Sequence, residues 1–303
     1  MNLHVHNAID EARLAKLLSD RLSVGEVTLE RLRVKSAWPV YRASAARIAP
    51  VFVKVTESAA ANRALDFLRR VDRCSLFPKV VFDGQLVFDE LSVLCLEWKD
   101  ARMVNAEDMN DAQLNSFVDG CGMLSCELRK AKMFTPIVQS DDMPETQYAM
   151  LSSYLHAHPL AGRLMRGLLD LPVAERTYGE LKLAVIHGDF QPKNYGFDGN
   201  RFVAVFDTDD LTEGLPCEDA AYAFTERARR SELGDVARSR LESLFAKFVS
   251  RSSWPIREWR IAINHARLRI AARRLAHHSS SPFIAIDIAR RDRPLQRLLK
   301  VLG

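Results

Sequence analysis

The stretch that decides the fold is residues 183–210, LAVIHGDFQPKNYGFDGNRFVAVFDTDD. It begins with a short apolar run, continues with a polar loop at 187–194, and ends with two apolar runs separated by Asp198-Gly199-Asn200. Apolar runs on either side of such turn residues are typical of the two strands of a hairpin. We therefore expect a hairpin that brings the polar loop close to the acidic residues at 207–210.

The polar groups of this stretch predict a cation site. His187-Gly188-Asp189 and Asn194 follow one apolar run, and Asp207-Thr208-Asp209-Asp210 follows another. Carboxylates that meet at one mouth repel one another unless a cation lies between them, and a set of oxygen ligands suits magnesium. The sequence therefore predicts Mg²⁺ at this mouth.

Length and composition are typical of a globular protein. The chain has 303 residues, of which 48% are hydrophobic, enough for a large core and for two lobes. No apolar run is long enough to span a membrane, and the N-terminus lacks the layout of a secretory signal. Five cysteines without a CxxC pair indicate reduced thiols, so we expect a cytoplasmic protein.

The first hundred residues have the residue types of a sheet. Apolar and alternating runs predict six strands, at 27–34, 39–45, 49–55, 77–82, 86–88 and 91–98. Apolar positions at helical spacing predict helices at 7–22 and 58–71. Taken alone, Lys54 between Val53 and Val55 is typical of a solvent-facing residue of a strand.

After Asp100 helical spacing dominates. Helices are predicted at 106–132, 147–156, 160–169, 173–181, 217–230, 233–250, 256–278 and 284–302. The expected fold class is therefore α+β. A small, antiparallel, β-rich lobe with one inserted helix would comprise residues 1–98, and a large, mostly helical lobe would comprise residues 99–303.

The charge of the chain is uneven. The net charge is +4, but the segment from residue 251 onward carries +9 and the first 250 residues carry −5. One interpretation is that the last helices have solvated, arginine-rich faces. The other is that an anionic substrate, an anionic lipid head group or a nucleic acid binds at this end. No aromatic interleaving or zinc-finger pattern supports a nucleic acid, so none is expected.

Two segments resemble the catalytic elements of the aminoglycoside and choline phosphotransferases, relatives of the protein kinases. HGDFQPKN at 187–194 is similar to the HGDxxxxN catalytic loop of that family. Asp207, eighteen residues after Asp189, lies where the family has its second metal-binding Asp. The resemblance implies a bilobal, protein-kinase-like fold.

Three further segments resemble the same family, in the same order along the chain. SAWPVYRAS at 36–44, followed by FVKV at 52–55, is similar to the nucleotide loop and the strand that carries the nucleotide-binding lysine. LCLEWKDA at 94–101 resembles the hinge between the lobes, and GLPCEDAAYAF at 214–224 resembles a short segment that ends in Asp-Ala-Ala.

The resemblance implies transfer of the γ-phosphate of ATP with the help of Mg²⁺. Asp189 would accept or orient the proton of the attacking hydroxyl. Asn194 and Asp207 would hold magnesium, and Lys54 would reach the α and β phosphates. Ser36 would contact a phosphate.

The remaining assignments concern the adenine of the nucleotide, the catalytic loop and the phosphate acceptor. The resemblance implies that the backbone of Glu97, Trp98 and Lys99 pairs with the adenine edge, and that the ring of Trp98 or Phe88 packs on the base. The residues expected to brace the loop are His187, Gly188 and Asp219. The acids expected near the substrate are Asp209 and Asp210. In the helix at 58–71 Ala64 occupies the position of the glutamate that pairs with the lysine, so Glu57 or Asp66 would replace it.

We therefore expect an ATP-dependent kinase whose acceptor is a hydroxyl of a small molecule, such as a sugar, an amino alcohol or a related metabolite. The alternative is a non-catalytic nucleotide-binding module that docks a partner through its basic C-terminal segment. An aminoglycoside-resistance kinase is less favoured because that segment is basic. A protein kinase is less favoured because no HRD-type loop is present. Nothing in the sequence indicates the oligomeric state.

Overall fold

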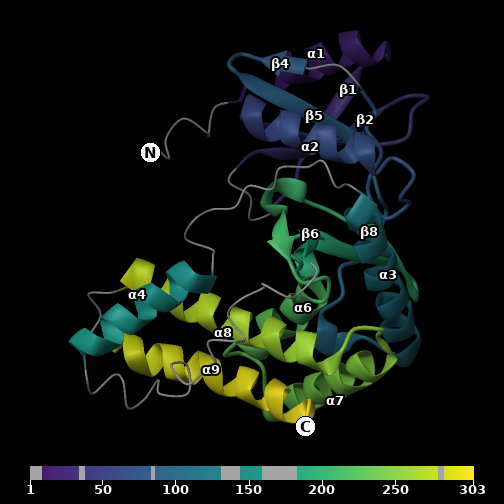
Figure 1. Ribbon diagram of the computed structural model, residues 1–303. Helices are drawn as coiled ribbons and strands as arrows, with labels where there is room; N and C mark the ends of the chain where they lie inside the picture. Colours follow the sequence, from purple (N-terminus) through teal and green to yellow (C-terminus); the bar gives the residue numbers. More distant parts are fainter. Residues whose placement is uncertain (1–8, 34–37, 83–85, 131–143, 159–182, 279–282) are drawn as a thin grey trace. The chain divides into compact units, whose positions relative to one another are not determined.

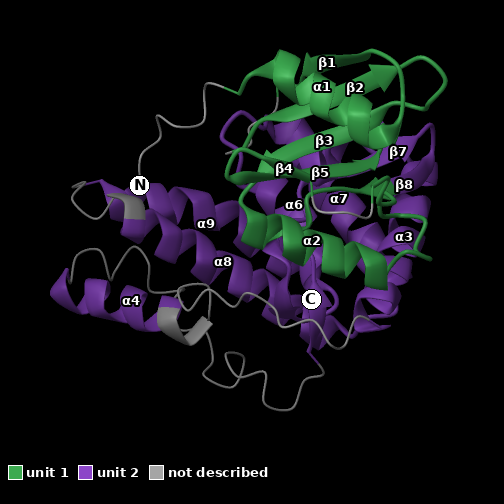
Figure 2. Cartoon of the chain, turned by 90° about the horizontal axis from the view of Figure 1, so that it is seen from above, with its two compact units in different colours: residues 1–101, 204–209 green, residues 102–203, 210–303 purple. Residues whose placement is uncertain are grey.

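A computed structural model describes residues 9–33, 38–82, 86–130, 144–158, 183–278 and 283–303. The chain forms two compact units, which are coloured separately in Figure 2. Unit 1 comprises residues 1–101 and 204–209, and unit 2 comprises residues 102–203 and 210–303. The sequence placed the boundary at residue 98, and it did not assign residues 204–209 to the first lobe.

Unit 1 is built on a five-stranded antiparallel sheet (Figure 1). Its strands, in spatial order, are β1 (Val27–Arg31), β2 (Val40–Ala45), β3 (Val51–Thr56), β5 (Leu91–Glu97) and β4 (Leu86–Phe88). The predicted meander of the first three strands is confirmed, because β2 pairs with both β1 and β3. Lys54 lies at the centre of the sheet, opposite Val40 on one side and Leu94 on the other.

The strand predicted at 77–82 does not form. Only an isolated bridge joins Val80 to Leu96 in that region. Pro78 has no N–H to donate to a ladder, and Phe77 instead closes a turn through its N–H to the carbonyl of Cys74. The apolar residues of this segment therefore led to the prediction of a strand that the structure does not contain.

Among its described residues, unit 1 has two α-helices. Helix α1 (Glu11–Leu22) begins at Asp10, whose carboxylate accepts the backbone N–H of Arg13. Its buried leucines join the sheet core, which also includes Phe88. Helix α2 (Ser58–Arg70) confirms the helix predicted at 58–71.

Unit 2 is mostly helical (Figure 1). Its helices within the described residues are α3 (Asp111–Lys130), α4 (Pro144–Ala157), α6 (Glu218–Ala228), α7 (Asp235–Arg251), α8 (Ile256–His278) and α9 (Ile284–Val301). Helix α8 contacts α4, α6 and α9. The helices predicted at 160–169 and 173–181 lie outside the described residues. No helix among the described residues is long and apolar enough to cross a membrane.

Two short strand pairs frame the polar loop of 187–194. Strand β6 (Ala184–Ile186), which precedes the loop, pairs with β9 (Thr212–Gly214). Strands β7 (Tyr195–Asp198) and β8 (Arg201–Val205) pair with each other, so the predicted hairpin is confirmed. The expected α+β class, with a small antiparallel sheet and a large helical part, is therefore confirmed.

Candidate functional site

The loop His187–Asn194 is tied to the chain at residue 210 by a close backbone approach. Gly188 has a φ of +79°, in the left-handed region that favours glycine. A Cβ on this residue would lie 2.1 Å from the carbonyl oxygen of Asp210. Only glycine therefore fits at this position, in agreement with the structural role expected for Gly188.

Asp219, near the start of α6, holds the beginning of the loop through hydrogen bonds to its backbone. Its two carboxylate oxygens accept the backbone N–H groups of His187 and Gly188, at 2.8 Å and 3.0 Å. Both Asp219 and His187 are buried. Burial is the largest influence on Asp219 and raises the pKa of its carboxyl, while His187 and the two N–H donors oppose this shift. The contacts agree with the bracing role that the sequence predicted for Asp219.

Asp189 is held at the opening of the loop by its own neighbours. The side chain of Gln191 donates to one of its carboxylate oxygens at 2.6 Å, and Asn194 donates to the other at 3.0 Å. The same carboxamide nitrogen donates to the Asp189 carbonyl at 2.8 Å. Lys193 lies 3.3 Å from the carboxylate. Asp189 is therefore held by three neighbouring side chains, and its own side chain is still 17% exposed.

Aromatic rings support the loop from the core of unit 2. Phe190 is fully buried, and its ring centroid lies 5.9 Å from that of Phe117 and 5.1 Å from that of Tyr195. Phe202 of β8 packs against Phe117 at 5.3 Å. The loop is therefore anchored by Phe190, while Asp189 and Gln191 are partly exposed and Lys193 is exposed.

Lys54 forms a charged group with two acids of unit 1. Its ammonium lies 3.0 Å from Asp207 and 2.5 Å from Asp209. Lys54 is only 7% exposed, so the expectation of a solvent-facing lysine, taken from its strand alone, is wrong. Burial lowers the pKa of Lys54, but the two carboxylates outweigh it and the net shift is upward.

Asp207 has a backbone conformation that is uncommon for residues other than glycine. Its φ is +58°, which costs a non-glycine residue about 1 kcal/mol, although Asp tolerates it better than most. The residue follows the apolar end of β8, where the sequence placed a metal ligand.

The two acids that were expected to replace the helix glutamate beside Lys54 make other contacts. Glu57 occupies the N-cap of α2, and Asp66 makes an ion pair with Arg70 at 3.0 Å. The acids that contact Lys54 are Asp207 and Asp209 instead. Asp209 therefore lies against the lysine, whereas the sequence assigned it to the substrate region.

The hinge residues lie at the end of β5. The Glu97 carboxylate accepts the backbone N–H of Lys79 at 3.2 Å, and the Lys99 ammonium donates to the carbonyl of Ser75 at 3.1 Å. The ring of Trp98 is covered by the guanidinium of Arg42, at 5.0 Å. Since Phe88 is 4% exposed in the sheet core, it is not available to stack on a base. Ser36 lies outside the described residues.

The donor atoms of the loop fit a hard cation. Because the carboxamide nitrogen of Asn194 makes both bonds to Asp189, the carboxamide oxygen is the atom that would coordinate. Among the described residues, no group of three or more His, Cys, Asp and Glu side chains is placed to hold a metal ion. Magnesium commonly takes only one or two protein ligands and completes its shell with phosphates and water.

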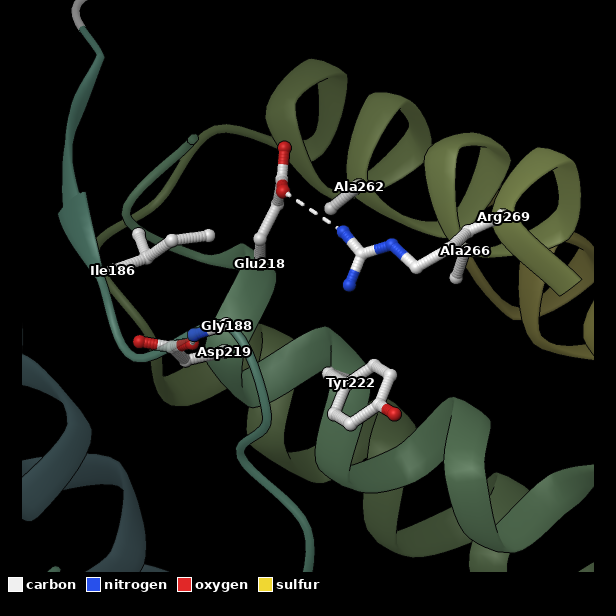
Figure 3. Close-up of a pocket in the computed structure, with 8 residues that line it drawn as sticks. All are labelled: Ile186, Gly188, Glu218, Asp219, Tyr222, Ala262, Ala266 and Arg269. Atoms are coloured by element: carbon white, nitrogen blue, oxygen red, sulfur yellow. Dashed lines mark hydrogen bonds and ion pairs between the residues drawn. The ribbon is translucent and has the colours of Figure 1, made fainter. Parts of the chain in front are cut away.

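A small pocket beside the loop contains residues that the sequence did not single out (Figure 3). Gly188 and Asp219 line one side, and Tyr222 of α6 and Arg269 of α8 line the other. Its volume of about 10 Å³ holds little more than one water molecule. The guanidinium of Arg269 lies over the ring of Tyr222 at 5.7 Å, and 3.8 Å from the Glu218 carboxylate.

Solved structures with the same fold are phosphotransferases at low sequence identity. Amicoumacin kinase hAmiN, in complex with AMP-PNP, Ca²⁺ and Ami, is 13% identical with a TM-score of 0.59, and the match covers 96% of this chain and 94% of that one. A thermostable mutant of aminoglycoside phosphotransferase APH(4)-Ia, in a ternary complex with ADP and hygromycin B, is 15% identical with a TM-score of 0.59, covering 94% and 98%. Aminoglycoside phosphotransferase APH(2'')-Ib with bound ADP is 15% identical with a TM-score of 0.58, covering 97% and 99%.

These similarities establish the protein-kinase-like fold. A comparison with curated protein sequences finds no significant match. The family model described as "Phosphotransferase enzyme family" matches residues 29–247, which is more than half of the chain and includes both Lys54 and the loop of Asp189. The chain therefore belongs to the APH phosphotransferase enzyme family.

Proposed function

We propose that the chain is an ATP-dependent kinase that transfers the γ-phosphate to a hydroxyl of a small molecule. The observation that carries the proposal is the fixed, partly exposed carboxylate of Asp189, held by Gln191 and Asn194 on a loop that Asp219 braces. Such a carboxylate is suited to orient an attacking hydroxyl, because phosphoryl transfer depends mainly on positioning and on charge neutralisation.

In the proposed reaction, the hydroxyl oxygen of the acceptor forms a bond to the γ-phosphorus, and the bond from that phosphorus to the β–γ bridging oxygen breaks. ADP leaves with the bond electrons, and Asp189 accepts the hydroxyl proton. Lys54 would contact the α and β phosphates, and the backbone of residues 97–99 would pair with the adenine. Magnesium, held by Asn194 and Asp207 with the nucleotide, would neutralise phosphate charge.

The charged group around Lys54 must rearrange in this mechanism. The ammonium is paired with Asp207 and Asp209 in this structure, and phosphates would have to replace at least one of these partners. This observation also favours a second candidate function, a module that binds nucleotide without transferring phosphate. In that case the lysine would remain paired with its acids and would not position phosphates for transfer.

The test is an ATP-consumption screen over sugars, amino alcohols, nucleosides and aminoglycosides, with wild-type protein and with Asp189→Asn. For the kinase we expect at least one acceptor to be phosphorylated, and turnover to fall by about 10²–10⁴-fold in Asp189→Asn because the proton acceptor is lost. The control is Asp198→Asn, which changes an exposed acid of β7.

The result has three clear outcomes. Transfer that survives unchanged in Asp189→Asn contradicts the assigned base. Thermal stabilisation by Mg²⁺ and ATP without transfer to any acceptor supports the binding module. Phosphorylation of a small molecule by the wild type removes the binding module from consideration.

A further inference from the structure

A second pocket lies between α6 and α8 and is lined by arginines. Its volume is about 180 Å³, enough for a compact ligand or for one end of a larger ligand. The arginines that line it are Arg229, Arg269, Arg273 and Arg274. Ala266 and Ile270 contribute apolar wall, and Glu226 contributes the one acid among its lining residues.

This second pocket continues from the small pocket beside the catalytic loop. Tyr222, Ala266 and Arg269 line both of them, so the two pockets adjoin at these residues, which Figure 3 shows together with Gly188. Gly188, the chain neighbour of Asp189, lines the small pocket together with Tyr222. Burial is the largest cause that raises the pKa of Tyr222 to about 12, and the charge of Asp189 adds to it. A ligand in the arginine pocket would therefore lie close to the proposed base.

The ion pairs among the described residues around the pocket contain more guanidiniums than carboxylates, and they include the pair of Arg269 with Glu218 at 3.8 Å. Glu226 is shared by Arg229 and Arg230. Asp287 is shared by Arg274 and Arg291. Since each of these carboxylates serves two guanidiniums, an excess of positive charge remains around the pocket.

The arginines are placed to bind an anion strongly. The side chains of Arg269, Arg229 and Arg274 are 17%, 26% and 28% exposed, so their charges are partly shielded from water, whereas Arg273 is exposed. Partial burial strengthens hydrogen bonds between a guanidinium and a carboxylate or phosphate. Partial burial also disfavours a lipid surface or a nucleic acid as the ligand, because those partners need charges on an open face.

We propose that the hydroxyl acceptor carries a carboxylate or a phosphate, and that this group binds to Arg269 and Arg273 in the pocket between α6 and α8. This inference rests on the proposed kinase function and adds the substrate class. It excludes polycationic acceptors such as aminoglycosides, since they would bring positive charge against the arginines.

The experiment combines turnover with direct binding. In the turnover arm, each anionic acceptor is compared with its neutral counterpart: glycerol 3-phosphate and glycerate with glycerol, and ribose 5-phosphate with ribose. In the binding arm, inorganic phosphate and glycerate are titrated by calorimetry into protein saturated with ADP and Mg²⁺, so that the nucleotide site is already filled.

The variants are Arg269→Gln, Arg273→Gln and the double variant, with Arg257→Gln as the matched control. Arg257 is an exposed arginine of the same helix and does not line the pocket. We expect anionic acceptors to be preferred over neutral ones, and the double variant to raise their KM by about tenfold or more. The Kd of the anion probe should rise by a similar factor, and Arg257→Gln should change neither value. Unfolding midpoints of the single variants check that Arg269→Gln still folds, and Arg273→Gln changes an exposed residue.

Two results would overturn the inference. One is turnover of neutral acceptors that equals or exceeds that of their anionic counterparts. The other is the absence of saturable binding of both phosphate and glycerate, or binding that is as strong in the double variant as in Arg257→Gln. Probe binding that depends on the arginines, without transfer to any acceptor, would keep the anion site and remove the kinase function. Transfer to neutral acceptors without probe binding would keep the kinase function and remove the anion site. The relative response to phosphate and to glycerate identifies which anionic group the pocket prefers.

Discussion

The loop at 187–194 and the charged group at Lys54 are built on different principles. The loop is held by neutral and charged hydrogen bonds to residues of low exposure. Asp219 is 5% exposed and Asn194 is 3% exposed. The group at Lys54 consists of three charges, and its two acids have side chains that are 35% and 34% exposed. Folding of unit 2 therefore fixes the loop, whereas the charges around Lys54 hold one another.

This difference indicates how the two regions act in the proposed reaction. A proton acceptor is needed in one position throughout the reaction, and a braced loop provides this. A phosphate-binding lysine must contact phosphates when nucleotide binds, and carboxylates that are about one-third exposed can be replaced at modest cost. We therefore expect substitutions around the loop to lower stability strongly, and substitutions around Lys54 to alter nucleotide binding more than stability.

The largest effect is expected for Asp219→Ala. The variant leaves the buried N–H groups of His187 and Gly188 without their acceptor, and each loss of this kind costs about 1–3 kcal/mol. We expect the free energy of unfolding to fall by about 2–5 kcal/mol, measured by urea denaturation, with loss of transfer activity. Asp198→Ala, an exposed acid on β7, is the control and should stay within about 0.5 kcal/mol of wild type. A stable Asp219→Ala protein with an intact loop would show that the brace is dispensable.

An intermediate effect is expected from the packing beneath the loop. In Gly120→Ala the new Cβ would lie 2.2 Å from the ring of Phe202, which is packed within the aromatic cluster. We expect a loss of about 1–3 kcal/mol, because that ring must shift. Gly122→Ala is the matched control on the same helix, with no atom within 4 Å of the new Cβ. It should stabilise the protein by about 0.5–1 kcal/mol through helix propensity. Equal effects in the two variants would mean that helix propensity, and not the contact with Phe202, decides at this position.

The parts of the site that are local in sequence were predicted, and the parts that depend on distant contacts were not. The arrangement of HGDFQPKN is determined locally, since Asp189 and Asn194 contact each other within six residues of chain. The acids that hold Lys54 come from residues 153 and 155 positions further along the chain, and no local pattern indicates such a pairing. The prediction from sequence was therefore limited to the helix that follows the Lys54 strand, and it named Glu57 or Asp66 as the partner.

The arginine pocket illustrates a signal that the sequence contained but could not locate, since anion binding at the basic end was one of its two interpretations. Arg269 and Arg273 are four residues apart on α8, a spacing that places both on one face of a helix. The excess of positive charge after residue 250 was visible, but its position next to Tyr222 depends on how α8 packs against α6. The fold class was predictable because the strand and helix periods are strong, while the failed strand at 77–82 shows that a single proline can override an apolar run.

The smallest effect on stability is expected for Asp209→Asn, which removes one of the two charges on Lys54. Asp207 remains as a partner, and Asp209 is about one-third exposed, so the free energy of unfolding should change by less than about 1 kcal/mol. Nucleotide affinity should rise, because phosphates then compete with one carboxylate and not with two.

The variant also lowers the pKa of Lys54, which the two acids now raise above 10.5. Since a raised lysine pKa stabilises the fold fully below the unfolded value and less above it, wild type should lose stability as pH rises beyond 10.5 and Asp209→Asn should lose less. Urea denaturation across this pH range and calorimetric titration with Mg²⁺ and ATP measure both effects. Weaker nucleotide binding in Asp209→Asn would mean that Asp209 assists the nucleotide directly and does not merely occupy the lysine.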